Sequence, residues 1–347
     1  MLELESMHVP FRMILTGQHQ ETMGLLIRQF GIKTAPVIIY DGKEVAGVGQ
    51  MIFWFFICFF KIFIRSRDVF ARNAAGVGYL LIHGDTASTL LGALVGRLFG
   101  LSIVHVEAGL CSKRIFDPFP EEIIRRVVAK MSDIAFCPGS WAVANLATSR
   151  SFVVNTGRNT LVDSLAIALE SIKAGEGGRI DNYAVASVHR TENIFNKKRF
   201  SVILELIEEV SRQRHVVFVL HPSTQRILEK RRLMSRLRLN PNISLVARMG
   251  YFEFIGLVSR ADFVITDGGG NQEELSYLGI PTLVMRTVTE RSEGIGSTAV
   301  ICCFERAVVN NFIASLDKFS GKAEGTSLPS PSRMIAVELK RRVDVNG

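Results

Sequence analysis

Short apolar runs alternate with amphipathic segments along most of the chain from Tyr79 onward. Continuous runs without polar alternation are typical of strands buried on both faces of a parallel sheet. The amphipathic segments between them are typical of helices packed on such a sheet. The runs predict strands at 79–83, 101–106, 133–137 and 151–155, and again at 183–188, 215–220, 242–246, 262–266 and 281–285.

The stretch "AGEGGRIDN" at 174–182 interrupts this rhythm, because it is rich in glycine and charge and has no periodicity. We therefore predict a first Rossmann-like domain at 1–173, a linker at 174–182, a second such domain at 183–320, and a tail with a final helix at 321–347. The expected fold class is α/β, with two doubly wound domains that face each other across a cleft. Ligands of such sheets bind beyond the carboxyl ends of the strands, so the cleft is the expected site.

The stretch "GQMIFWFFICFFKIFIRSRD" at 49–68 is apolar on every side of a helix. A bilayer span needs about 20 apolar residues, and the uninterrupted run here is only 51–60, so we predict no span. It also lies too far from the N-terminus to be a signal peptide, so a cytoplasmic location is expected. Two interpretations remain open for 51–64: a helix buried in a soluble protein, or an aromatic face with a basic end that contacts a membrane surface.

Charge and cysteine content narrow the function classes. The formal net charge of +8 favours a phosphate-bearing ligand or an anionic surface. The most basic segment, 229–239, has no interleaved aromatic residues, so nucleic-acid binding is not predicted. The five cysteines have no C-x-x-C spacing, which predicts neither a disulfide framework nor a zinc site. Four of them stand in apolar runs and are expected in the core: Cys58, Cys137, Cys302 and Cys303.

Polar and ionisable residues follow most of the predicted strands. The segments concerned are "HGDTAST", "EAGL", "HRTEN", "HPST", "DGGGNQEE" and "RTVTERSEG". Because parallel strands end at one edge of a sheet, these residues are expected to converge there.

The glycine run 268–270 comes just before a helix expected to begin near Asn271. Glycines allow close backbone approach, and a helix N-terminus attracts anions, so this arrangement fits a phosphate. Arg286, Arg291 and His189 are candidate cations or donors for it. The alternative is ordinary punctuation between a strand and a helix.

The carboxylates form the second candidate group. Asp85 and Glu107 each follow a buried strand, and Glu121 and Glu122 open a helix. Asp85 could instead be an N-cap, and Glu122 reads best as an acid that complements the helix dipole. Glu107 needs a partner or a function, because a carboxylate beside an apolar strand is costly. Acids facing a phosphate site suggest acid/base chemistry on the group attached to the phosphate.

Taken in order, "HGDTAST", "HVEAGL", "PFPEEIIRR", "HRTEN", "TDGGGNQEE" and "TERSEG" resemble the UDP-N-acetylglucosamine 2-epimerase family over most of the chain. The resemblance implies a GT-B fold and interconversion of UDP-GlcNAc and UDP-ManNAc, or hydrolysis to UDP and ManNAc, through elimination of UDP to a 2-acetamidoglucal. It implies no metal and no cofactor. A homodimer and a role in polysaccharide or glycoconjugate precursor synthesis are expected.

The resemblance also implies roles for individual residues. The catalytic positions match Asp85, Glu107, Glu121 and His189, and the UDP-binding positions match His221, Gly268, Gly269, Gly270, Glu274 and Arg291. Several features depart from the family pattern. By this resemblance the usual first strand and turn are absent at the N-terminus, Cys111 stands where arginine is usual, and Arg158 lies beside a usual glycine. Two alternatives therefore stay open: a GT-B glycosyltransferase with a UDP-sugar donor, and a nucleotide-sugar-binding homologue without turnover.

Overall fold

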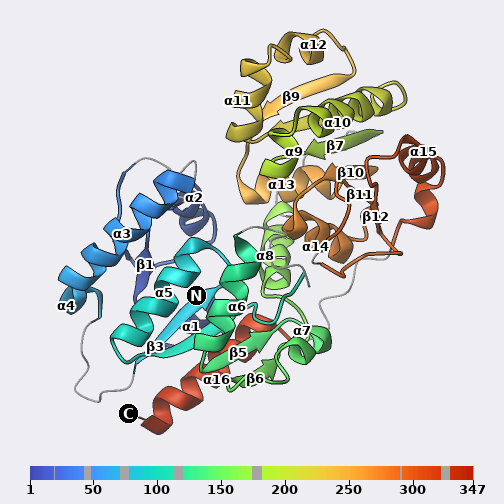
Figure 1. Cartoon of the computed structure of the whole chain (residues 1–347). Helices are drawn as coiled ribbons and strands as arrows, with labels where there is room; N and C mark the ends of the chain where they lie inside the picture. Colours follow the sequence, from blue (N-terminus) through green and yellow to red (C-terminus); the bar gives the residue numbers. More distant parts are fainter. Residues whose placement is uncertain are drawn as a thin grey trace. The chain divides into compact units, whose positions relative to one another are not determined.

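The computed structural model describes the chain except for residues 19, 43–47, 71–77, 113–119, 174–181, 290, 322–328 and 347. The chain divides into two compact units, Met1–Asp163 with Pro329–Gly347, and Ser164–Leu328 (Figure 1). The last helix, α16 (Pro331–Asn346), therefore belongs to the first unit, although it follows the second in sequence. The predicted linker at 174–182 lies almost entirely outside the described residues.

The first unit is built on a parallel sheet of order β3-β4-β5-β6. Its strands are β3 (Tyr79–His83), β4 (Ser102–Val106), β5 (Ile134–Cys137) and β6 (Phe152–Asn155), as the apolar runs predict. A separate parallel pair joins β1 (Met13–Leu15) to β2 (Pro36–Ile38). The helices are α1 (Leu2–Ser6), α2 (Gln20–Gln29), α3 (Val48–Ile64), α4 (Ser66–Val69), α5 (Ala87–Leu98), α6 (Glu121–Met131) and α7 (Ser140–Asn145), besides α16. Helix α8 (Leu161–Lys173) begins at the end of this unit.

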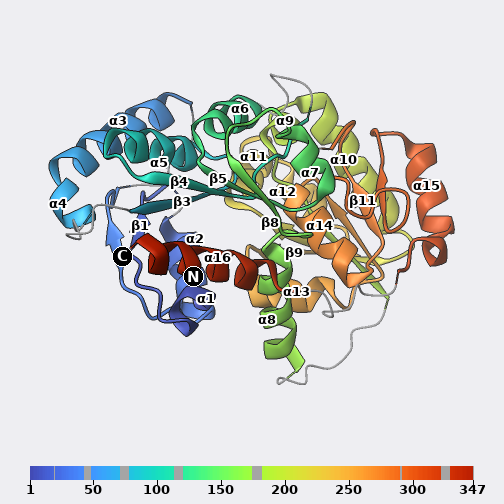
Figure 2. The same cartoon turned by 90° about the horizontal axis from the view of Figure 1, so that it is seen from below.

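Helices cover both faces of this sheet. Figure 2 shows α5 and α6 on one face and α16 with α1 on the other. The alternation of side chains along β4 explains the two cores: Ile103 packs with α5 and α6, whereas Val104 and Val106 pack with α1 and α16. With both faces covered, the loops at the carboxyl ends of the strands are the expected place for functional residues.

Helix α3 contains the aromatic run and lies on α5 in both views. Trp54, Cys58 and Ile62 recur at four-residue spacing and are buried against α5, and the Trp54 indole N–H donates to the Thr16 carbonyl at 2.9 Å. Among the described residues, no helix is long and apolar enough to cross a membrane. The interpretation as a packed helix therefore holds for one side of α3, while other residues of the run face solvent.

The second unit has a six-stranded parallel sheet of order β12-β11-β10-β7-β8-β9. The strands are β7 (Tyr183–Ser187), β8 (His215–Leu220), β9 (Ile243–Ala247), β10 (Phe263–Thr266), β11 (Thr282–Val284) and β12 (Ala299–Ile301). The helices are α9 (Thr191–Ile194), α10 (Lys197–Val210), α11 (Pro222–Lys230), α12 (Met234–Arg238), α13 (Tyr251–Val258), α14 (Gly269–Leu278) and α15 (Arg306–Ala314), with a 3-10 turn at Leu316–Lys318.

The strand order of this sheet reverses between β7 and β10. From β7 the chain moves outward through β8 and β9, and it then returns to β10 and moves the other way through β11 and β12. Such a topological switch point opens a crevice at the carboxyl ends of the two central strands, where doubly wound sheets bind ligands. The loops after β7 and β10 are therefore the expected binding loops of this unit.

One prediction for the core is wrong. Cys58, Cys137 and Cys302 are buried as expected, but Cys303 is exposed. It follows β12 and has a φ of 50°, so the backbone turns there and directs the side chain away from the core that its neighbour enters.

Candidate active site

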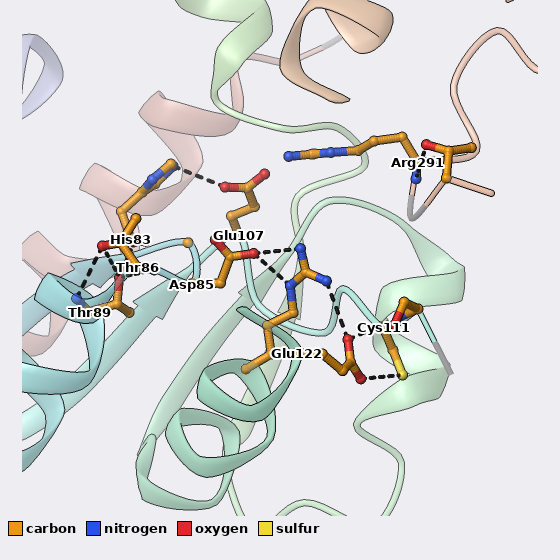
Figure 3. Close-up of polar contacts among 12 residues, drawn as sticks. His83, Asp85, Thr86, Thr89, Glu107, Cys111, Glu122 and Arg291 are labelled. Carbon is orange, nitrogen blue, oxygen red and sulfur yellow. Dashed lines mark hydrogen bonds and ion pairs between the residues drawn. The ribbon is translucent and has the colours of Figure 1, made fainter. Parts of the chain in front are cut away.

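The carboxyl end of the first sheet gathers acidic side chains. Asp85 lies two residues after β3, Glu107 follows β4 directly, and Glu121 is the first residue of α6. Figure 3 shows Asp85 and Glu107 with Glu122, the second residue of α6. The strands bring together residues that lie far apart in sequence, as the predicted parallel sheet requires.

Asp85 is held by a cation rather than by a helix end. The Arg125 side chain donates from Nε to Asp85 Oδ2 at 2.7 Å, and its Nη1 donates to Glu122 Oε2 at 3.3 Å. The N-cap of α5 is Thr86, whose hydroxyl oxygen accepts from the Thr89 N–H. The alternative interpretation of Asp85 as the N-cap is thus wrong, and the carboxylate is available for another role.

Glu107 has a strained backbone and a defined side chain. Its φ is 64°, in the left-handed region that residues with a side chain rarely adopt, and such strain is concentrated at functional sites. The Asn159 amide donates to Glu107 Oε1 at 2.7 Å, and His83 Nε2 lies 3.7 Å from Oε2. Since Asn159 lies beyond β6, the two outer strands of the sheet together fix this carboxylate.

Glu122 is a buried member of the same network. It accepts from the Ser112 N–H at 3.1 Å, from the Cys111 thiol at 3.3 Å and from Arg126 at 3.1 Å. Burial works against its ionised form, but these donors and Arg125 lower its pKa. Its position at a helix start agrees with the structural interpretation, and its contacts show that Cys111 occupies part of this network.

The second unit brings its own candidates together at the switch point between β7 and β10. Asp267, directly after β10, is fully buried and accepts from the backbone N–H groups of His189 and Arg190, after β7, at 2.9 and 3.0 Å. Asn193 donates to the same carboxylate at 3.0 Å and to the Met285 carbonyl at 3.0 Å. Asp267 therefore fixes the loop that carries His189.

His189 and His221 stack, with ring centroids 4.2 Å apart. Burial and nearby cations lower the pKa of His189 to about 4, and burial and His189 lower the pKa of His221 to about 3. Both rings are therefore neutral at pH 7 and can donate one N–H each without carrying a charge.

The glycine run has two distinct roles. Gly268 is the N-cap of α14, so the helix begins at Gly269, two residues earlier than predicted. A Cβ at Gly268 would lie 3.1 Å from His189 Cε1, so the residue must be small for the ring to occupy its place. A Cβ at Gly270 would meet no atom within 4 Å. There is therefore open space beside the first turn of α14, and a helix N-terminus of this kind attracts anions.

Glu274 and Arg291 lie farther along this unit. Burial raises the pKa of Glu274 to about 7, although the Tyr251 hydroxyl and Arg291 oppose the rise. The Arg291 guanidinium forms an ion pair with Glu273, which also accepts from the Tyr277 hydroxyl at 3.2 Å. Arg286, the other candidate cation, is buried.

Three residues of these networks were not singled out from the sequence: Arg125, Asn159 and Asp267. Each has a signal in hindsight, because Arg125 stands in the "PFPEEIIRR" motif, Asn159 stands in "NTGRNT" and Asp267 precedes the glycine run. Within the described part of the chain, no group of three His, Cys, Asp or Glu side chains is arranged to hold a metal ion.

Comparisons with known proteins identify the family to which the chain is similar. The family model described as UDP-N-acetylglucosamine 2-epimerase matches residues 3–329. A UDP-N-acetylglucosamine 2-epimerase of Methanocaldococcus jannaschii is 34% identical over 251 residues, which cover 68% of this chain and 66% of that protein, slightly less than two thirds of its length. A UDP-2,3-diacetamido-2,3-dideoxy-D-glucuronate 2-epimerase of Pseudomonas aeruginosa is 33% identical over 248 residues, with coverages of 69% and 68%.

A solved structure extends the likeness to nearly the whole chain. The crystal structure of the M. jannaschii UDP-GlcNAc 2-epimerase in complex with UDP-GlcNAc and UDP has a TM-score of 0.80 at 26% identity and covers 98% of this chain and 94% of that one. The predicted fold class, α/β of the GT-B type with two parallel sheets, is confirmed, although the order β3-β4-β5-β6 of the first sheet shows no reversal among the described strands.

Proposed function

Because the chain belongs to the UDP-N-acetylglucosamine 2-epimerase family, we propose that it inverts the configuration at C2 of a UDP-linked 2-acetamido sugar, with UDP-GlcNAc and UDP-ManNAc as the first pair to test. The observation that carries the proposal is the family match over residues 3–329. Support comes from the acids at the strand ends of the first unit and from the anion-binding features of the second.

In this proposal the second unit holds UDP. The N-terminus of α14, with Gly268 as N-cap and Gly269 and Gly270 in the first turn, offers N–H groups and a positive dipole end to the diphosphate. His189 and His221 supply neutral N–H donors, and Glu274 takes the ribose hydroxyls. These donors also stabilise the charge that develops on UDP as the C1–O bond breaks.

In this proposal the acids of the first unit remove the proton H2 and return a proton to C2. H2 is weakly acidic, so its removal needs a positioned carboxylate, for which Asp85, Glu107 and Glu121 are the candidates. As the base removes H2, the C2–H electrons form the C1–C2 double bond, and UDP leaves with the electrons of the C1–O bond. Return of a proton to the opposite face of C2 and of the UDP oxygen to C1 completes the inversion. In the hydrolysing variant, water adds at C1 instead.

The two similar relatives are both named as 2-epimerases, and they differ in the sugar that is named. Both act at C2 of a UDP-linked sugar with an acetamido group, one on UDP-N-acetylglucosamine and one on a diacetamido glucuronate. We therefore propose the reaction class first and the sugar second, and both sugars belong in the assay.

Proton NMR in deuterated water tests the proposal directly. The protein is incubated with UDP-GlcNAc, and the H2 signal, the UDP-ManNAc signals and released UDP are followed. Loss of H2 together with a UDP-ManNAc signal supports epimerisation, and UDP with free ManNAc supports hydrolysis. Calorimetric binding of UDP-GlcNAc without any exchange with either sugar contradicts the proposal and favours the non-catalytic homologue. UDP release that depends on an added glycan or lipid acceptor favours a glycosyltransferase.

A further inference from the structure

Helix α3 presents a continuous apolar stripe to solvent on the side opposite its buried face. Six of its side chains are more than half exposed, among them Phe53 at 68% and Phe60 at 59%. The full stripe consists of Ile52, Phe53, Phe56, Phe60, Phe63 and Ile64. These positions follow one another at three- and four-residue spacing, so they lie on one face of the helix.

The stripe continues onto the neighbouring helix α5. Leu94 and Leu98 are exposed there, and the rings of Phe63 on α3 and Phe99 after α5 lie 6.2 Å apart. Figures 1 and 2 both show α3 and α5 side by side. We call the exposed residues of α3 with Leu94 and Leu98 the aromatic face. Apolar surface of this extent is unusual on a protein unless something covers it.

The charged side chains on the two helices of the aromatic face are basic. Helices α3 and α5 contain no acidic residue, and their only charged residues are Lys61 and Arg97. Arg65 and Arg67 follow α3 directly, and the only acid up to the end of α4 is Asp68.

The acids near this face are only weakly engaged. Lys61 lies 3.8 Å from Asp41 and Arg65 lies 4.0 Å from Asp68, and both pairs are exposed, so water and salt screen their attraction. Both cations can therefore exchange these partners for phosphates of a headgroup. The net charge of the chain, +8, adds a long-range attraction to an anionic surface.

We propose that the aromatic face binds the surface of an anionic lipid bilayer, with α3 lying flat. A helix of 17 residues is about 25 Å long, so all four exposed phenylalanines reach the boundary between headgroups and acyl chains at once. Lys61 and Arg65 then meet the phosphates, because an anionic surface attracts basic residues that lie close to it. The helix does not enter the hydrocarbon core, because its other side packs on α5 through Trp54.

Vesicle flotation of the full-length chain tests this proposal. The vesicles contain phosphatidylcholine alone or with about one third phosphatidylglycerol, at low and high salt. We expect flotation with the anionic vesicles, at least tenfold less with phosphatidylcholine, and a clear fall at high salt because the charged component is screened. The double variant Phe56→Ser/Phe60→Ser should lose at least tenfold in binding, and Lys61→Gln several-fold.

Phe195→Ser is the matched control, because Phe195 is 60% exposed, close to the 56% of Phe56, but lies in the second unit. It should float as the unchanged chain does. Absence of flotation, or equal flotation of the Phe56→Ser/Phe60→Ser variant, overturns the proposal. Analytical ultracentrifugation gives a second readout: a dimer that this double variant dissociates, without vesicle binding, assigns the face to a second copy of the chain instead.

Discussion

Arg125 donates to Asp85 Oδ2 at 2.7 Å across 40 residues of sequence, and the same guanidinium reaches Glu122. One buried cation thus links the loop after β3 to the start of α6. We infer that Arg125 positions Asp85 for proton transfer and also neutralises a carboxylate that is fully buried. Any cation of suitable length can neutralise the buried carboxylate. Only a forked donor can position Asp85 at the same time.

Substitution of Arg125 should separate these roles. Arg125→Gln removes the cation that contacts Asp85 and leaves Glu122 with Arg126 alone, which costs about 3 kcal/mol of stability, and it should abolish H2 exchange. Arg125→Lys should recover most of the stability but little of the exchange, because a single ammonium cannot hold both carboxylates in the same geometry. Thermal unfolding and H2 exchange measure the two effects.

UDP binding is the control for these variants. The residues proposed to hold UDP belong to the second unit, so the dissociation constant of UDP should stay within about twofold in Arg125→Lys. Full exchange activity in Arg125→Lys would contradict the positioning role.

Glu107 should show a trade between stability and activity. In ordinary positions alanine is more stable than glycine, but at a φ of 64° a side chain costs about 1 kcal/mol or more. Glu107→Gly should therefore unfold at a higher temperature than Glu107→Ala, although both lose the contact with Asn159. Glu107→Gln, which keeps the shape, should lower H2 exchange by at least a hundredfold.

A residue with ordinary backbone geometry provides the control for the comparison of the glycine and alanine variants. Glu229 is exposed in helix α11, and there the alanine variant should be the more stable. If alanine were also more stable than glycine at Glu107, the backbone strain at that residue would be absent.

Gly268 and Gly270 form a matched pair. Gly268→Ala places a Cβ 3.1 Å from His189 Cε1, so the imidazole must shift, and we expect UDP affinity to fall about tenfold, a change of about 1.4 kcal/mol. Gly270→Ala meets no atom within 4 Å and should leave the NMR signals of His189 unchanged. Calorimetry with UDP and histidine chemical shifts measure both variants.

The pair also distinguishes two causes of weaker binding. If Gly270→Ala weakens UDP binding while His189 is undisturbed, the ligand itself approaches Gly270. If Gly268→Ala leaves both the His189 signals and the UDP affinity unchanged, the proposed role of Gly268 is wrong.

The apolar runs of the sequence predicted the strands of the two sheets better than they predicted the side-chain contacts of the site. Nine strands were expected from continuous apolar runs, and each is present within about a residue of its predicted ends. The strands that were not predicted, β1, β2 and β12, have three residues each, too few to produce a recognisable run. Strand-end placement also brought Asp85 and Glu107 to one edge, because parallel strands all end there.

The contacts that complete the site could not be predicted in this way. Asp267 binds backbone groups of His189 and Arg190, and that pairing depends on the strand order β10-β7, which no run of residues encodes. The same holds for Asn159. It follows β6 and reaches Glu107, which follows β4, only because a single strand, β5, lies between these two strands in the sheet. The side of α3 that is exposed also depended on packing, since every side of that helix is apolar.

Glu274 should make the stability of the second unit depend on pH. Burial raises its pKa from 4.5 to about 7, so between these pH values the folded state keeps a proton that the unfolded state has released. The stability associated with the protonated form is therefore fully present below pH 4.5 and is lost as pH rises through 7, by up to about 3 kcal/mol. Glu274→Gln has no proton to lose, so its melting temperature relative to the unchanged chain should rise from pH 5 to pH 8. Glu229→Gln, at an exposed carboxylate, is the control and should show no such trend. A Glu274→Gln difference that is constant over this range would mean that Glu274 is ionised in the folded chain throughout.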